Sequence, residues 1–173
     1  ASGSGKSTLF RTLSGIWPYW RGRMALPSGA SMLFLPQKAY LPIGSLKKAV
    51  CYPGKSEDHS DEAVAEALEA VGLDARRGEL ERVENWAQVL SGGEQQRIAF
   101  ARVLINGPDW VFLDEATSSL PEAAEAELYE LLARRLPGTT LVSIGHRESL
   151  ARHHARRLAW RDSGGNAPQL VSA

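Results

Sequence analysis

The chain has 173 residues, 43% of them hydrophobic, which is long enough for one domain with a buried core. Twenty Lys and Arg residues balance twenty Asp and Glu residues, so the formal net charge is zero, which argues against an extensive nucleic-acid-binding surface. The single cysteine, Cys51, excludes an internal disulfide and favours a reducing compartment.

The predicted elements alternate between helices and strands. In the first part of the chain we expect a helix over 5–13, a connector rich in Gly, Pro and Trp over 15–23, a strand over 31–35, a loop-rich stretch over 42–57 and a helix over 61–71. In the second part we expect a helix over 91–105, a strand over 110–113, a helix over 121–136 and a strand over 139–144. A further strand near 157–161 and a loose tail over 163–173 follow.

This alternation predicts an α/β fold with a parallel sheet. Residues 45–106 are mostly helical, so we expect them to form a subdomain inserted between two parts of one sheet. The whole chain, residues 1–173, is then one domain.

No apolar stretch reaches the ~18–20 residues that a membrane-spanning helix needs, and no signal peptide is recognisable. The sequence starts at Ala1 inside a phosphate-loop pattern. We therefore expect a fragment of a longer polypeptide, with another segment or chain crossing any membrane that it serves.

The first eight residues, ASGSGKST, match the phosphate-loop pattern G-x-x-x-x-G-K-[ST], except that its first glycine would precede Ala1. Such a loop wraps backbone N–H groups around phosphate oxygens, with Lys6 on the β- and γ-phosphates and the Ser7 hydroxyl on Mg²⁺. The alternative, a flexible Gly/Ser terminus, is disfavoured by the helix-forming residues that follow. The predicted nucleotide-binding residues here are Ser2, Gly3, Ser4, Gly5, Lys6, Ser7 and Thr8.

A hydrophobic strand, WVFLDEAT, ends in two acidic residues. Asp114 is placed to hold Mg²⁺, and Glu115 is placed to polarise the attacking water. The alternative is a solvated acidic turn, which spacing alone does not reject. The presence of the phosphate loop in the same chain favours the catalytic interpretation.

The stretch LSGGEQQR, residues 90–97, places a Gly-Gly pair after a serine at the start of a helix. Backbone N–H groups and the helix dipole make such a turn an anion-binding cradle. Many loops have this property, and the two other motifs give this one its specificity.

With these three motifs the chain resembles the nucleotide-binding domain of ABC transporters. The segments FLPQKAYLPIGSLKKAVCYP and ERVENWAQVLSGGEQQR are similar to the peroxisomal fatty-acyl half-transporters and to bacterial relatives linked to vitamin B12, bleomycin and antimicrobial peptides. The resemblance implies a P-loop NTPase core of the ABC ATPase type, with its N-terminal strands missing from this fragment. It also implies an ATPase that binds ATP and Mg²⁺ and powers substrate movement across a membrane.

The resemblance assigns roles to further residues. Gln37 matches the Q-loop glutamine, which senses Mg²⁺ and the attacking water, and His146 matches the switch histidine that contacts the γ-phosphate. Without the resemblance, a loop glutamine and a strand-end histidine would be read as solvated or packed. Ser91, Gly92 and Gly93 would bind the γ-phosphate of ATP held by a second domain.

The partners implied are therefore a second nucleotide-binding domain in a head-to-tail homodimer and a transmembrane domain of the same polypeptide, docked on residues 36–53. The expected place is the cytoplasmic face of a membrane, in bacteria the inner membrane, with no nucleic-acid partner. The alternative is a soluble ABC ATPase of DNA repair or translation. The interval between the phosphate loop and LSGGEQQR has no sustained heptad pattern, which disfavours the coiled-coil repair proteins.

Some residues depart from the family or match none of its motifs. Pro121 occupies the position where the family has an aspartate that communicates between the two ATP sites, so inter-site coupling is expected to differ. A non-hydrolysing regulatory module remains a third interpretation. His153 and His154 match no motif and are predicted to lie on the surface, and Gln96 is expected only to face solvent or to pack its helix.

Overall fold

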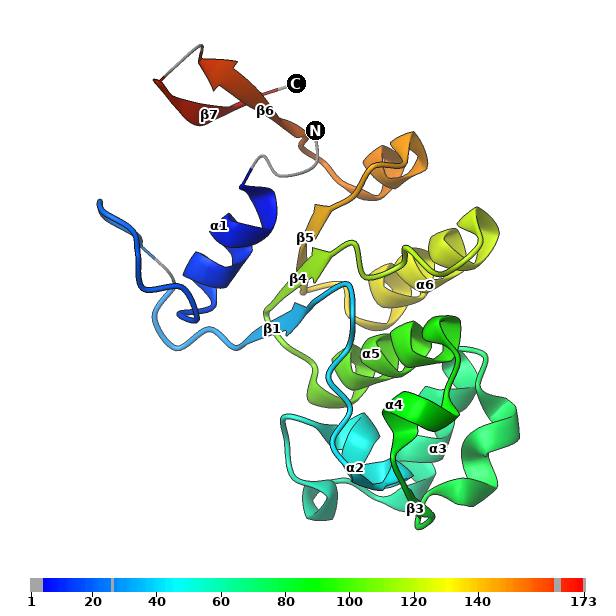
Figure 1. Cartoon of the computed structure of the whole chain (residues 1–173). Helices are drawn as coiled ribbons and strands as arrows, with labels where there is room; N and C mark the ends of the chain where they lie inside the picture. The colour runs from blue at the N-terminus through cyan, green and yellow to red at the C-terminus, as the bar shows by residue number, and fades with distance from the viewer. Residues whose placement is uncertain (1–4, 26, 164–165, 173) are drawn as a thin grey trace.

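The computed structural model describes residues 5–25, 27–163 and 166–172, and its centre is a three-stranded parallel sheet (Figure 1). Strand β4 (Trp110–Asp114) lies between β1 (Met32–Leu35) and β5 (Thr140–Ile144). Leu33 is opposite Val111, which is opposite Leu141. The three strands end at the same edge, and the expected α/β fold with a parallel sheet is confirmed.

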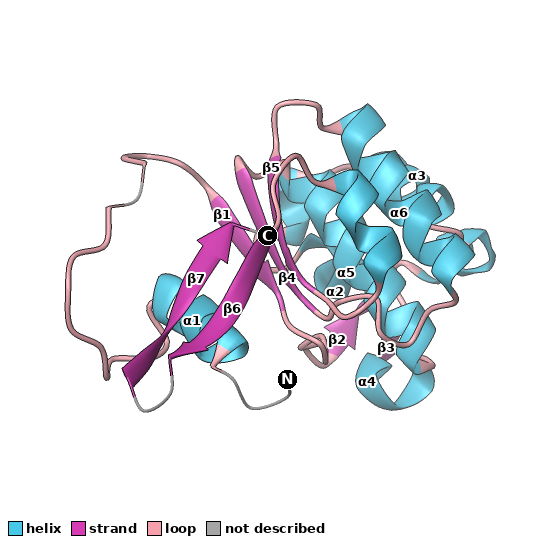
Figure 2. Ribbon diagram, turned by 90° about the horizontal axis from the view of Figure 1, so that it is seen from above, coloured by secondary structure: helices cyan, strands magenta, loops and turns pink. Residues whose placement is uncertain are grey.

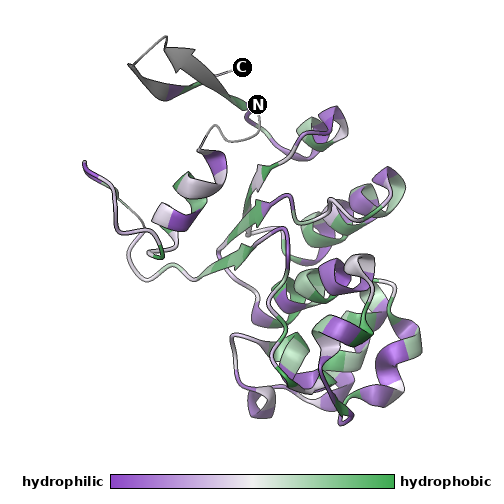
Figure 3. Ribbon diagram, in the orientation of Figure 1, coloured by the Kyte–Doolittle hydropathy of each residue, from purple (hydrophilic) through white to green (hydrophobic). Residues whose placement is uncertain are grey.

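Helices cover both faces of this sheet (Figure 2). Helix α1 (Lys6–Leu13) lies on one face, where the ring of Phe10 meets Phe112 edge-on at 5.4 Å. Helices α5 (Gly92–Asn106) and α6 (Glu122–Arg135) lie on the other face. Strands β1 and β4 are mainly apolar (Figure 3), as expected for strands with helices on both faces of their sheet, whereas β5 has no buried residue.

The stretch between β1 and α5 is built mainly of short helices. It contains β2 (Gly44–Ser45), α2 (Leu46–Cys51), the 3-10 helix η1 (Ser56–Asp58), α3 (Asp61–Ala70), the 3-10 helix η2 (Asp74–Glu79), β3 (Val83–Glu84) and α4 (Trp86–Val89). Trp86 is fully buried at its centre and donates an indole hydrogen bond of 2.9 Å to the Gly44 carbonyl.

The expected loop over 42–57 is wrong, because β2, α2 and η1 lie within it. Helix α2 has only six residues, too few to show a helical period. The Ser45 hydroxyl caps it by accepting a hydrogen bond from the Lys48 N–H, and its apolar residues are buried in the core.

The expected loose tail over 163–173 is also wrong for the residues described. Strands β6 (Leu158–Ser163) and β7 (Asn166–Ser172) form an antiparallel pair in which Ala159 is opposite Val171. Pro168 and the polar neighbours of the second strand hide its pattern in the sequence. The 3-10 helix η3 (Glu148–His153) joins β5 to this hairpin.

The other predicted helices and strands occur within one or two residues of their expected bounds. Pro121 precedes α6 as its N-cap and is not its first helical residue. No described helix is both long enough and apolar enough to span a bilayer.

Candidate nucleotide-binding site

The start of α1 lies against the end of β4. Gly5 caps the helix with a left-handed backbone, φ 91°, that favours glycine. The Ser7 hydroxyl donates a 3.1 Å hydrogen bond to the Asp114 carboxylate, while Lys6 is half-buried and Thr8 is exposed. The predicted residues Ser2, Gly3 and Ser4 lie outside the described residues.

Three predicted catalytic residues meet at the ends of three neighbouring strands. Glu115 follows β4, Gln37 follows β1 and His146 follows β5. The Gln37 amide donates a 3.1 Å hydrogen bond to Glu115 Oε2, and His146 Nε2 lies 2.9 Å from Glu115 Oε1. Parallel strands with their carboxyl ends at one edge produce this meeting from distant parts of the sequence.

The backbone of Glu115 is unusual, because it is the one non-glycine residue with a positive φ, 51°, among the described residues. Its N–H donates a 2.9 Å hydrogen bond to the Ile144 carbonyl at the end of β5. Such a conformation in a non-glycine residue costs of order 1–3 kcal/mol and persists where the surroundings hold it. Here it aims the carboxylate at Gln37 and His146.

The neighbouring Ser7 and Asp114 provide a hydroxyl and a carboxylate, which are the oxygen ligands that Mg²⁺ prefers. In nucleotide sites the metal takes one or two protein oxygens and completes its shell with phosphate and water. The described residues contain no cluster of three or more His, Cys, Asp or Glu side chains that could hold a metal ion. These residues therefore fit a magnesium–nucleotide site.

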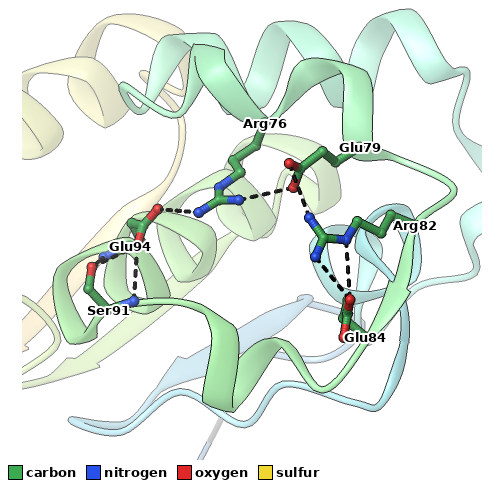
Figure 4. A network of polar contacts seen from close by, with 6 residues as sticks. All are labelled: Arg76, Glu79, Arg82, Glu84, Ser91 and Glu94. Atoms are coloured by element: carbon green, nitrogen blue, oxygen red, sulfur yellow. Dashed lines mark hydrogen bonds and ion pairs between the residues drawn. The ribbon is translucent and has the colours of Figure 1, made fainter.

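The LSGGEQQR stretch begins α5 with a reciprocal cap (Figure 4). The Ser91 hydroxyl and N–H donate hydrogen bonds of 2.8 Å and 2.9 Å to Glu94 Oε2, and the Glu94 N–H donates to Ser91 Oγ. Arg76 donates to the other Glu94 oxygen at 3.1 Å and to Glu79. Burial raises the pKa of Glu94, but the Ser91 and Arg76 contacts outweigh it and the net pKa is lowered.

The signature loop, Ser91–Gly93, lies against the turn that follows Glu115. A Cβ atom added to Gly92 would lie 3.2 Å from Ser119 Oγ, and one added to Gly93 would lie 3.2 Å from a Leu120 methyl. In the described part of the chain, no hydrogen bond or ion pair joins this loop to Lys6, Glu115 or His146. Hydrogen bonds therefore join one group of predicted residues, and in the described part of the chain none of them includes the signature loop.

Gln96 is a site residue that the sequence interpretation missed. It is 3% exposed, and its side chain donates to the Gln37 carbonyl at 3.4 Å and to Ser118 Oγ at 3.2 Å, and accepts from the Ser119 N–H at 2.9 Å. It links the Gln37 loop to the turn after Glu115. The available signal was a polar residue one turn before Phe100 on the apolar face of α5.

The prediction that His153 and His154 lie on the surface is only partly right, because both are half-buried against Tyr129 of α6. The His154 ring lies 2.9 Å from Ser143 Oγ, which lies 2.9 Å from the Tyr129 hydroxyl. His153 stacks on Tyr129 with ring centroids 5.2 Å apart. Burial lowers the pKa of His153 and raises the pKa of Tyr129 to about 12.

The chain is similar to known proteins in sequence and in structure. A sequence model of the family described as ABC transporter matches residues 1–118. An uncharacterized ABC transporter ATP-binding protein of Haemophilus influenzae is 43% identical over 163 residues, which are 94% of this chain and 27% of that protein. The human ATP-binding cassette sub-family D member 3 is 38% identical, covering 88% of this chain and 24% of that protein.

Two further similarities agree with these. The mouse lysosomal cobalamin transporter ABCD4 is 41% identical over 89% of this chain and 27% of its own length. The structure of a bacterial Atm1-family ABC exporter with ATP bound has a TM-score of 0.75 and 27% identity over 87% of this chain and 29% of that one. The chain thus spans about a quarter of the curated relatives that it matches.

Proposed function

Because this chain belongs to the ABC transporter family, we propose that it is the ATP-binding and ATP-hydrolysing domain of a membrane transporter. The convergence of Gln37 and His146 on Glu115, beside the Ser7–Asp114 contact, supports this proposal most strongly. Two of the relatives described above are named as an ABC transporter ATP-binding protein and a cobalamin transporter, which favours transport over the soluble alternative in DNA repair or translation.

Each residue of the strand-end group has a role in this proposal. Lys6 and the N–H groups at the start of α1 bind the β- and γ-phosphates, and Ser7 and Asp114 hold Mg²⁺, which neutralises phosphate charge. Glu115 accepts hydrogen bonds through both carboxylate oxygens, so it is oriented to take a proton from water. In this proposal Gln37 and His146 fix that orientation, and His146 also contacts the γ-phosphate. The remaining nucleotide-binding residues of the proposal are Ser2, Gly3, Ser4, Gly5 and Thr8.

The signature loop serves a second copy of the domain. Ser91 caps α5, and in the described residues neither the Gly92 nor the Gly93 N–H donates a hydrogen bond to a protein group. Two uncommitted N–H groups at the start of a 15-residue helix suit a phosphate oxygen. Because they are separate from the phosphate loop of their own chain, an ATP bound to a second copy is the ligand in this proposal.

The proposed transmembrane partner docks beside the Gln37 loop. Tyr40, Ile43 and Val83 are large apolar residues that are 61%, 70% and 68% exposed, on the segments around β2 and β3. Exposed apolar groups gathered on one surface are typical of interaction sites. In this arrangement residues 1–173 are one domain with a helical subdomain over 45–106, at the cytoplasmic face of a membrane, in bacteria the inner membrane.

The test is the release of phosphate from ATP by the full-length protein in lipid membranes, with and without Mg²⁺. The proposal predicts hydrolysis that requires Mg²⁺. Absence of hydrolysis in protein that binds ATP would instead support the non-hydrolysing regulatory interpretation.

A further inference from the structure

An ion pair begins at the residue after His146; its carboxylate is buried, whereas its arginine side chain is 35% exposed. The Glu125 side chain, on α6, is 3% exposed, and Arg147 Nη1 lies 3.4 Å from its Oε2. The hydroxyl of Thr117 also donates a hydrogen bond to this carboxylate. The other arm of the guanidinium, Nη2, donates a 2.9 Å hydrogen bond to the Leu120 carbonyl. Arg147 therefore contacts both α6 and the turn that precedes α6.

These contacts connect the two loops that carry the proposed catalytic pair. Thr117 and Leu120 belong to the turn that follows Glu115, whereas Arg147 directly follows His146. The His146 side chain is itself 56% exposed, and the residue before it is glycine. Besides the contact between His146 and Glu115, the Arg147 guanidinium is thus a second side-chain link between the His146 loop and the Glu115 turn.

The cost of burying the Glu125 carboxylate favours a geometric role of this ion pair over a purely stabilising one. Removing a carboxylate from water costs several kcal/mol, and an apolar pair of similar volume often stabilises a core equally well. An apolar side chain, however, cannot donate to the Leu120 carbonyl. Arg147 Nη2 hydrogen-bonds the Leu120 carbonyl while Nη1 lies within ion-pair distance of Glu125, and the planar guanidinium fixes these two directions.

We propose that Arg147, held by Glu125, is a positioning residue that keeps His146 aligned with Glu115 during ATP hydrolysis. This inference rests on the proposed function, because it assumes that His146 and Glu115 act on ATP. Arg147 itself touches neither nucleotide nor water in this account. It acts through the loop that it anchors.

The single substitution Arg147→Met leaves Glu125 buried without a cation and can prevent folding. The informative variant is therefore the double substitution Arg147→Met with Glu125→Gln, which removes both charges and keeps an acceptor for Thr117. The matched control makes the same two substitutions in the exposed pair Arg134 and Glu130 of the same helix, 3.9 Å apart. All are made in the full-length protein, and the folded fraction is measured by ATP-binding stoichiometry.

We expect the double variant to bind ATP stoichiometrically, with a KM within about twofold of wild type and a kcat lower by about tenfold or more. Arg147→Lys, which can reach one acceptor at a time, is expected to have an intermediate kcat. The Arg134 and Glu130 control is expected to match wild type. A kcat within about twofold of wild type in the folded double variant would overturn the inference.

Failure of the proposed function is distinguishable from failure of this inference. If the wild-type protein releases no phosphate from ATP with Mg²⁺, the proposed function fails and the inference falls with it. If Glu115→Gln is inactive while the double variant keeps wild-type turnover, only the positioning role of Arg147 is overturned.

Discussion

Glu115 Oε1 lies 2.9 Å from Nε2 of His146, although 31 residues separate them in the chain. The contact exists because β4 and β5 are parallel neighbours, with Asp114 opposite Ile144 at their ends. The left-handed backbone of Glu115 then turns its carboxylate toward the histidine. The proposed hydrolysis depends on this relationship.

Replacement of His146 by alanine is expected to lower kcat by about a hundredfold, because Glu115 loses one of its two side-chain partners and the γ-phosphate loses a contact. The KM for ATP is expected to stay within about threefold, since the phosphate loop is untouched. Steady-state phosphate release measures both constants. His59→Ala is the matched control, because His59 lies in the helical region, away from the strand ends. Full activity of His146→Ala would remove this residue from the mechanism.

The signature loop is expected to control association of two copies. Ser91→Ala removes the hydroxyl that caps α5, and Gly92→Ala places a Cβ atom 3.2 Å from Ser119 Oγ in the proposed phosphate cradle. Both variants are expected to bind ATP as wild type does and to lose ATP-dependent dimerisation. Each substitution is combined with Glu115→Gln, and light scattering with and without ATP measures the fraction of dimer. ATP-dependent dimers in both variants would exclude the loop from the interface.

Gly145 is expected to tolerate no side chain, because an added Cβ atom would lie 2.2 Å from a Leu150 methyl. Gly145→Ala must displace buried Leu150 and with it the His146 loop, so we predict a loss of ~1–3 kcal/mol in the free energy of unfolding. The ATP turnover of Gly145→Ala is also expected to fall, because the His146 loop is displaced. Adding Leu150→Ala makes room and is expected to restore turnover toward that of Leu150→Ala alone. If Gly145→Ala were as stable and active as wild type, the loop would not pack as described.

Trp86 anchors the helical region between β1 and α5. Trp86→Phe removes the hydrogen bond to the Gly44 carbonyl and leaves that carbonyl without its partner, for an expected loss of ~1–3 kcal/mol in the free energy of unfolding. Chemical denaturation measures this loss. The exposed Trp17 offers a control, because Trp17→Phe is expected to change stability by less than about 0.5 kcal/mol. Equal stability of the two variants would contradict the anchoring role.

The larger elements of the fold could be predicted because each has a strong local pattern. The apolar strands ending at Leu35 and Leu113 and the capped helix after Ser91 are examples, and the structure has all three. Helix α2 and strand β7 could not be predicted. The first is shorter than two turns, and the second is defined by pairing with β6 and not by its own residues.

Prediction of the site had a similar limit. Lys6, Asp114 and Glu115 stand in motifs with a direct chemical meaning, whereas Gln37 and His146 were found through resemblance to a family. Glu125 and Arg147 belong to no pattern that spacing reveals, and the spacing of Gln96 from Phe100 indicates burial but no partner. Their roles follow from contacts between residues 22 or more positions apart, such as the one between Arg147 and Glu125. Only the tertiary structure shows these contacts.

The substitution Glu115→Gln tests the central claim most directly, because it keeps the size and one acceptor oxygen of the side chain and removes the carboxylate that takes the proton. ATP binding and single-turnover phosphate release are measured in the full-length protein with Mg²⁺. The account predicts ATP affinity within about threefold of wild type and a rate of phosphate release lower by about 10²–10⁴-fold. Release at the wild-type rate, with ATP bound, would contradict it.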